Sequence, residues 1–262
     1  MSLKIGITGQ SGFIGTHLYN TLKIFPEKYK CISFQRNFFD NHNRLEQFVS
    51  QCNVIVHLAA LNRHNDPAVI YETNLNLVNR LIQAMENTQS KPHVLFASSI
   101  QENQENSYGQ SKKEGRLLLE KWARQNQAQV TGLIIPNVFG PFGHPYYNSV
   151  VATFCHQLTH GEQPQIHVDG EIKLIYVAEL IQVMIDQILG TGESPSPIVH
   201  PVVAHTSTIM VSELLEKLLS FKQSYLEKQI IPGIHNTFDR NLFNTFVCYI
   251  DHASFFPGKL EA

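Results

Sequence analysis

The first half of the chain alternates between short, nearly continuous apolar runs and longer amphipathic segments. The apolar runs lie at 3–8, 30–35, 53–59, 93–98 and 129–136. Segments with helical periodicity separate them, at 13–25, 44–51, 67–86 and 107–125. Strands that are apolar on both faces are typical of a parallel sheet with helices on either side. The pattern therefore predicts an α/β fold with a doubly wound parallel sheet and right-handed crossovers.

The composition changes after Pro136. Residues 137–148 are rich in glycine, proline and aromatic side chains, which predicts a loop. The remaining sequence predicts helices and strands in no simple alternation, with helices at 149–160, 178–189 and 211–227 and strands at 165–168 and 173–177. We therefore expect a sheet domain at 1–136 and a smaller C-terminal, substrate-binding part at 137–262. Some segments of this second part are free to return to the sheet.

The composition excludes several classes of partner. The 262 residues carry a formal net charge of −2 at pH 7, so nucleic acid and anionic membranes are not expected partners. No signal peptide and no apolar run long enough for a membrane span are apparent, so the expected location is cytoplasmic. The four cysteines are widely scattered, which favours free thiols. We expect no metal site, and we expect core packing for His57, which lies in an apolar run.

Three glycines at a spacing of three residues follow the first apolar run, in "ITGQSGFIG". Gly9, Gly12 and Gly15 stand where a strand passes into a helix, as in a Rossmann-type turn. Glycine permits positive φ and leaves the backbone open to a ligand, and the start of a helix favours a phosphate group. Two interpretations follow from the residues alone, a dinucleotide site or a glycine-rich turn without a ligand.

The second apolar run ends at Gln35 and Arg36. A carboxylate near this position would bind the 2′-hydroxyl of NAD, whereas an arginine offers a fork of donors to the 2′-phosphate of NADP. Arg36 therefore favours NADP, and an ordinary surface arginine is the alternative.

The helix predicted at 107–125 begins with "SYGQSK", which places Tyr108 and Lys112 at i and i+4 on one face. A neighbouring ammonium lowers the pKa of a phenol, so the pair suits proton transfer near neutral pH. A solvated helix face is the alternative. We expect Leu117, Leu118 and Trp122 on one side of the same helix. The preceding strand ends at Ser98 and Ser99, at the edge of the sheet where ligands of such folds bind. This placement favours the catalytic interpretation.

Several motifs occur in a characteristic order along the chain: "TGQSGFIG", "VIVHLAA", "NLNLVNRLIQA", "FASS", "YGQSK" and "PNVFG". Together they resemble the extended short-chain dehydrogenase/reductases, which form the NAD-dependent epimerase/dehydratase family. The segments "SSIQENQENSYGQSK" and "YYNSVVATFCH" are similar to the reductase domain of bifunctional enzymes of capsular polysaccharide synthesis. Those enzymes make a precursor of UDP-N-acetyl-L-fucosamine.

The resemblance implies a catalytic trio in which Ser99 orients a carbonyl, Tyr108 protonates its oxygen and Lys112 assists Tyr108. It also implies NADP(H) as the cofactor. The residues implied for cofactor binding are Gly9, Ser11, Gly12, Phe13, Ile14, Gly15, Arg36, Leu58, Ala59, Ala60, Asn74, Tyr108, Lys112 and Pro136. The residues expected to bind the substrate are Arg63, Ser99, Asn137 and Asn148.

The implied reaction is the NADPH-dependent reduction of the 4-keto group of a UDP-linked 4-keto-6-deoxy-N-acetylhexosamine, in capsule or O-antigen sugar-nucleotide synthesis. A homodimer is the implied assembly, and the cupin domain of the bifunctional enzymes is separate or missing. Two alternatives remain, a UDP-sugar 4-epimerase with bound NAD and a non-catalytic NADP-sensing protein. A 4,6-dehydratase is disfavoured because Ile100 and Gln101, rather than an Asp–Glu pair, follow Ser99.

Overall fold

The computed structural model describes residues 2–190 and 196–251. The chain forms two compact units, which we call the first and the second unit. The first unit comprises residues 1–136 and 178–204, and the second comprises 137–177 and 205–262. Residues 178–204, which the sequence places in the C-terminal part, thus belong to the unit that contains the large sheet.

The first unit is built on a six-stranded sheet in the order β2-β1-β3-β4-β5-β8, and all of its neighbouring strands run parallel. The strands are β1 (Leu3–Thr8), β2 (Tyr29–Ile32), β3 (Val54–His57), β4 (His93–Ser99), β5 (Val130–Ile135) and β8 (Ile198–Val199). The predicted α/β fold with a doubly wound parallel sheet is confirmed. Because the strands are parallel, the residues that follow β1, β3 and β4 emerge at the same edge of the sheet.

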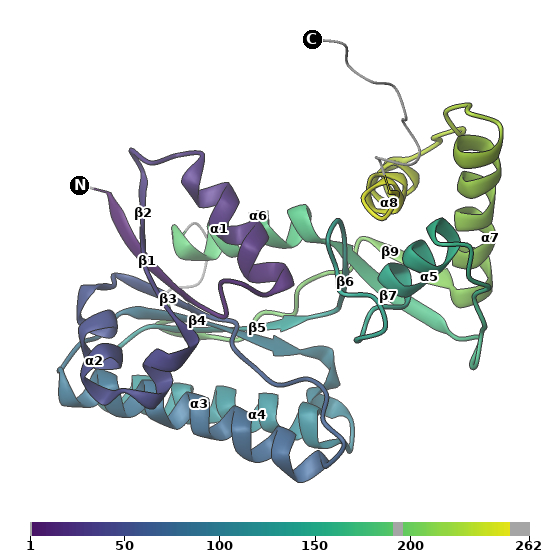
Figure 1. Ribbon diagram of the computed structural model, residues 1–262. Helices are drawn as coiled ribbons and strands as arrows, with labels where there is room; N and C mark the ends of the chain where they lie inside the picture. Colours follow the sequence, from purple (N-terminus) through teal and green to yellow (C-terminus); the bar gives the residue numbers. More distant parts are fainter. Residues whose placement is uncertain (1, 191–195, 252–262) are drawn as a thin grey trace. The chain divides into compact units, whose positions relative to one another are not determined.

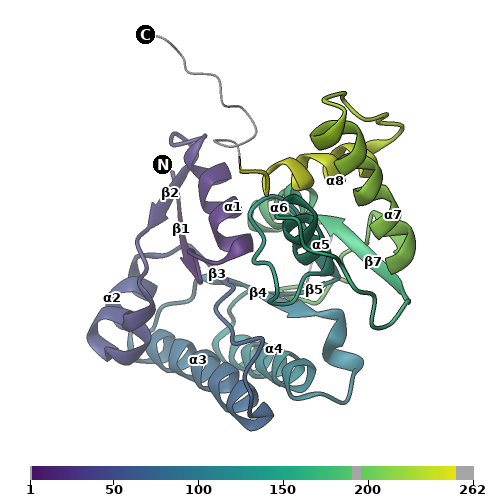
Figure 2. The ribbon, with the colours of Figure 1, turned by 45° about the vertical axis from the view of Figure 1, so that its right-hand side comes forward.

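Helices cover both faces of this sheet, with α1 and α6 on one face and α2, α3 and α4 on the other (Figure 1). The helices are α1 (Phe13–Lys23), α2 (His42–Gln51), α3 (Pro67–Asn87), α4 (Ser107–Asn126) and α6 (Val177–Ile188). Two short 3₁₀ helices, η1 (Arg36–Asp40) and η2 (Ile100–Asn103), follow β2 and β4. The view in Figure 2 shows α3 and α4 again side by side beneath the sheet.

Polar side chains fix where α3 and α4 begin. The side chain of Asp66 accepts a hydrogen bond from the Ala68 amide, and Pro67 occupies the first turn of α3. The side chain of Asn106 accepts from the Gly109 amide at the start of α4 (2.8 Å). The first turn of α4, which carries Tyr108, therefore has a defined starting point.

The buried face of α4 differs from the one that the sequence predicts. Trp122 is buried as expected, but Leu117 is 46% exposed. The buried side instead contains three charged residues at four-residue intervals, Lys112, Arg116 and Glu120. The expected grouping of Leu117 with Trp122 on one side of the helix is wrong, because five residues span more than one helical turn and place the two side chains on different sides.

The second unit contains a three-stranded sheet in the order β6-β7-β9. Its elements are β6 (Asn137–Phe139), α5 (Val150–Thr159), β7 (Glu171–Tyr176), β9 (Ser207–Met210), α7 (Val211–Phe221), the π-helical segment η3 (Lys222–Glu227) and α8 (Thr237–Val247). The helices α5, α7 and α8 pack against one another around a core that includes Phe139, Leu214 and Phe246 (Figure 2). The strand predicted at 165–168 is not formed, and its Val168 is 79% exposed. Its apolar residues have no neighbouring strand with which to pair.

A missing side chain on β5 makes room for Arg116. A Cβ on Gly132 would lie 2.5 Å from Cδ of Arg116, well inside normal contact distance. We expect Gly132→Ala to lower the free energy of unfolding by about 1–3 kcal/mol, because the buried arginine cannot move away freely. Chemical denaturation followed by circular dichroism measures this change.

The matched control is Gly170→Ala, since a Cβ there meets no atom within 4 Å. Its free energy of unfolding should change by less than about 0.5 kcal/mol. Equal destabilisation by the two variants would show that the cost does not come from Arg116.

Candidate active site

The glycine turn between β1 and α1 has a geometry that only glycine allows at two of its three positions. Gly9 has a φ of +76°, in the left-handed region. A Cβ on Gly15 would lie 2.2 Å from the Gly9 carbonyl oxygen. The Gly12 amide donates to that same carbonyl at 3.0 Å and closes the turn. Gly12 is also the N-cap of α1, so no capping side chain covers the first amides of the helix.

The loop after β3 lies directly against this turn. A Cβ on Gly9 would lie 2.8 Å from the Ala59 nitrogen. Asn74, buried in α3, holds the loop from behind: it accepts from the Leu61 amide (2.7 Å) and donates to the Leu61 carbonyl (3.0 Å). It also donates to Ser111 of α4 (2.9 Å). The structure therefore brings the predicted segments at 9–15 and 58–60 together, with Asn74 as the residue that positions the second one.

Arg36 is exposed and begins η1, shortly after β2. Because β2 is the parallel neighbour of β1, Arg36 and the glycine turn follow the same ends of adjacent strands. The position is compatible with the predicted contact to a phosphate group.

The predicted catalytic residues lie at the end of β4 and in the first turns of α4. Ser99 is the last residue of β4, and its Oγ accepts from the Gln101 amide (3.2 Å). The Gln101 carbonyl in turn lies against Gly109, the residue after Tyr108, where a Cβ would come within 1.9 Å of it. Tyr108 and Ser99 are thus linked by the short η2 segment. The Lys112 ammonium lies 5.7 Å from the centre of the Tyr108 ring.

Lys112 is a buried ammonium, only 4% exposed. Its Nζ donates to the Ala97 carbonyl (2.9 Å) and lies 5.0 Å from the centre of the Phe96 ring. Burial lowers the pKa of Lys112 to about 8, and the Glu102 carboxylate acts in the opposite direction. The alternative of a solvated helix face does not apply to this lysine.

His57 connects the glycine turn to this region. Its Nδ1 lies 2.8 Å from the Thr8 hydroxyl at the end of β1, and its ring stacks on Phe96. Burial, together with the charge of Lys112, lowers the pKa of His57 to about 3, so the imidazole is neutral at physiological pH. The predicted core packing of His57 agrees with these contacts.

The other predicted site residues are distributed over both units. In the first unit, Ser11 and Arg63 are exposed, Phe13 and Ile14 are partly buried, and Pro136 is buried after β5. Asn137 and Asn148 are exposed residues of the second unit.

Two buried charged residues near Ser99 were not among the predictions. Glu102 and Arg116 form an ion pair of 2.8 Å in the interior of the first unit. The four-residue spacing of Lys112, Arg116 and Glu120 is the signal in the sequence that points to a shared face.

Neither a metal centre nor a membrane segment is found in the described part of the chain. Within residues 2–190 and 196–251, no three histidine, cysteine, aspartate or glutamate side chains are grouped so that they could hold a metal ion. His156 of α5 and His160, which follows the end of this helix, stack ring on ring at 3.9 Å, and the described residues offer no third metal ligand beside them. In the same ranges, no helix combines the length and apolar character that a bilayer span requires.

The sequence profile of the NAD dependent epimerase/dehydratase family matches residues 5–188. The chain belongs to this family. Its glycine turn, the end of β4 and the start of α4 all lie inside the matched region. The family expected from the sequence motifs is thereby confirmed.

Two similar proteins each share 29% identity with the chain. One is the UDP-2-acetamido-2,6-beta-L-arabino-hexul-4-ose reductase of Pseudomonas aeruginosa, with 97% of the chain and 66% of the relative covered. The other is the crystal structure of the capsular polysaccharide assembling protein CapF from Staphylococcus aureus, with a TM-score of 0.80 and the same coverage. The chain therefore spans slightly less than two thirds of the length of these relatives.

A more distant structure supports the fold alone. The chain is 17% identical to RMD from Pseudomonas aeruginosa, which was solved in complex with NADPH. The TM-score is 0.78, and the match covers 95% of the chain and 98% of RMD.

The buried histidines make the first unit sensitive to acid. Burial lowers the pKa of His93 to about 4 and, with Lys112, that of His57 to about 3. In the unfolded chain both have a pKa of about 6.5, so below that pH the unfolded state binds more protons than the native state. The free energy of unfolding should therefore fall between pH 6.5 and 4, by about 1.4 kcal/mol per pH unit for each histidine.

Denaturation monitored through the single tryptophan, Trp122, measures this slope in the first unit. His93→Gln should reduce the slope, whereas His42→Gln, at an exposed position of α2, should not. An unchanged slope in His93→Gln would contradict the assignment.

Proposed function

We propose that this protein is an NADPH-dependent reductase that acts on the 4-keto group of a UDP-linked 4-keto-6-deoxy-N-acetylhexosamine. The observation that carries the proposal is the buried Lys112 ammonium beside the Tyr108 ring, at the end of β4 in the sheet that bears the glycine turn. The family membership and the reductase relative from Pseudomonas aeruginosa support it.

The glycine turn fits the phosphates of a dinucleotide. A Cβ on Gly12 would meet only the Gly9 carbonyl, at 3.2 Å, so a ligand can approach the backbone at this point. The amides at the start of α1 and the positive end of the helix suit a negatively charged group. Gly9, Gly12 and Gly15 would hold the pyrophosphate, and Arg36 would hold the 2′-phosphate. The bound NADPH would supply the hydride for the reduction.

Tyr108 is the proton donor in this proposal. Its hydroxyl would deliver a proton to the keto oxygen of the sugar, which would become the new hydroxyl group. The Lys112 ammonium favours the phenolate that remains, because opposite charges at this distance attract. Ser99 would donate a hydrogen bond to the same oxygen and orient the carbonyl.

The proposal also assigns the cofactor and the substrate to different residues of the chain. Residues 1–136 would bind the cofactor, with Leu58, Ala59 and Ala60 beside the adenosine. Arg63 and the second-unit residues Asn137 and Asn148 would bind the sugar nucleotide. We also propose a cytoplasmic homodimer, as the resemblance to the family implies. Light scattering of the purified protein measures the oligomeric state.

Tyr108→Phe should reduce the rate of NADPH oxidation with the keto sugar by roughly 10²–10⁴-fold, because the proton donor is lost. Binding of NADPH, measured by fluorescence titration, should be retained. The control is Tyr71→Phe on α3, where the hydroxyl contacts Glu114 instead, and its rate should stay at the wild-type level.

An active Tyr108→Phe variant would overturn the proposed mechanism. Wild-type protein that binds NADPH but oxidises it with no UDP-linked keto sugar would overturn the proposed reaction. Protein purified with tightly bound NAD would favour the 4-epimerase instead.

Arg36→Ala should shift the cofactor preference from NADPH toward NADH. A charge-assisted hydrogen bond contributes about 1.5–3 kcal/mol, so the affinity ratio of NADPH to NADH should fall by roughly 10–100-fold. Binding titrations with both cofactors measure this ratio. The exposed Arg44 of α2 provides the control, since Arg44→Ala should leave the ratio unchanged. Equal losses in both variants would show a general effect of positive charge.

A further inference from the structure

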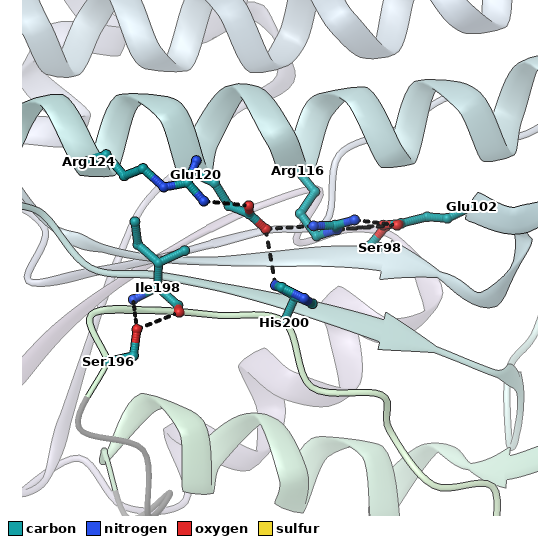
Figure 3. A network of polar contacts seen from close by, with 8 residues as sticks. All are labelled: Ser98, Glu102, Arg116, Glu120, Arg124, Ser196, Ile198 and His200. Carbon is teal, nitrogen blue, oxygen red and sulfur yellow. Dashed lines mark hydrogen bonds and ion pairs between the residues drawn. The ribbon is translucent and has the colours of Figure 1, made fainter.

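A chain of buried charges runs between α4 and the sheet in the first unit (Figure 3). The Glu102 carboxylate accepts from two nitrogens of Arg116, from Nη2 at 2.8 Å and from Nε at 3.0 and 3.3 Å. Arg116 also donates to Glu120 through Nη1 at 2.6 Å. The side chains of these three residues are only 3–10% exposed. Toward the surface, Glu120 contacts Arg124 and His200.

Burying such groups is costly unless every charge is compensated, and a well-packed apolar set is often at least as stable. The position of Glu102 therefore calls for a reason beyond stability. Its carboxylate also accepts a hydrogen bond from Ser98, the residue before Ser99. Glu102 thus ties the end of β4 to Arg116, one turn beyond Lys112 in α4.

The segment that carries Glu102 sits between the proposed catalytic residues. It is η2, in which the Gln101 amide donates to Ser99 and the Gln101 carbonyl packs closely against Gly109. On the buried side of η2, the Glu102–Arg116 ion pair joins this segment to α4. Glu102 is therefore connected to the end of β4 through Ser98 and to α4 through Arg116.

Glu102 and Lys112 contact consecutive residues of β4, since the Lys112 ammonium donates to the Ala97 carbonyl and the Glu102 carboxylate accepts from Ser98. The groups facing the ammonium are His57 from β3, the Phe96 ring and the Ala97 carbonyl from β4, Glu102 from η2 and Tyr108 from α4 itself. His57 is neutral, so Glu102 is the anion in this set. Burial alone would raise the pKa of Glu102, but its hydrogen bonds from Arg116 and Ser98 hold that pKa below its usual range.

We propose that Glu102 is a positioning residue for the proposed reductase, fixed by Ser98 and Arg116, which aligns Ser99 with Tyr108 and supplies the counter-charge for the Lys112 ammonium. This role rests on the proposed function, in which Lys112 assists Tyr108. Glu102 itself acts through Lys112 and Ser99 and makes no contact with the substrate.

The test compares Glu102→Gln with Glu120→Gln, since each removes one of the two carboxylates bound to Arg116. Lysine labelled with ¹³C reports the titration of Lys112 by NMR, with the signal assigned from Lys112→Met. Glu102→Gln should lower the pKa of Lys112 by on the order of one unit, because the charged form loses its nearby anion. Glu120→Gln should leave it within a few tenths of a unit.

The pH profile of NADPH oxidation gives a second readout. The alkaline limb of kcat should move to lower pH in Glu102→Gln and remain in place in Glu120→Gln. Glu102→Asp, which keeps the charge but withdraws it by one methylene group, should give a smaller shift in the same direction. If Glu102→Gln does not fold, Glu102→Asp against Glu120→Asp decides the question.

Equal Lys112 titration in wild type and the Glu102 variants would overturn the proposal, and so would equal shifts in the Glu102 and Glu120 variants. The NMR titration needs no substrate. If the wild-type protein reduces no keto sugar, the proposed function fails while the titration still tests the role of Glu102.

Discussion

The close approach of α4 to the sheet is the constraint on which the first unit depends. It is possible because Gly132 on β5 leaves space for Arg116, and because Gly115 on α4 lies close to Phe96 on β4. The approach brings the Lys112 ammonium within hydrogen-bond distance of the Ala97 carbonyl on β4. If α4 lay farther from the sheet by the length of one side chain, the Lys112 ammonium would lose the Ala97 carbonyl as its acceptor. It would also lie away from the end of β4.

This packing forces charged groups into a region that apolar side chains usually fill. The structure compensates for the burial of these charges by placing opposite charges next to each other in space, in the order Glu102, Arg116 and Glu120. A carboxylate that accepts several hydrogen bonds stays ionised even when buried. Burial is the main reason why the pKa of Lys112 falls to about 8 and why His57 on the adjacent strand stays neutral.

Much of the first unit could be predicted from the sequence because its strands are continuous apolar runs and its glycine turn has a distinctive spacing. Short motifs also identify Gly9, Ser99, Tyr108 and Lys112 as candidate site residues. The Glu102–Arg116 pair could not be predicted in this way. The sequence shows where charges lie on a helix, but only the packing of α4 against β4 and β5 decides which of them are buried.

The second unit was less predictable for a related reason. Ile166 and Val168 alternate with polar residues as in a strand, yet both are exposed. A strand needs a partner as well as a pattern, and the partners of β7 are β6 and β9. Those strands are short and far apart in the sequence, so local periodicity carries little information about their pairing.

The return of β8 to the edge of the large sheet has a consequence for the order in which the chain can fold during synthesis. Residues 198 and 199 pair with Val130 and Thr131, after more than 60 intervening residues that include β6, α5 and β7. A ribosome that has released only the first 136 residues exposes β5 as an open edge, without the helix α6 on one face. The sheet is completed only after part of the second unit has already emerged, so the two units cannot mature strictly one after the other.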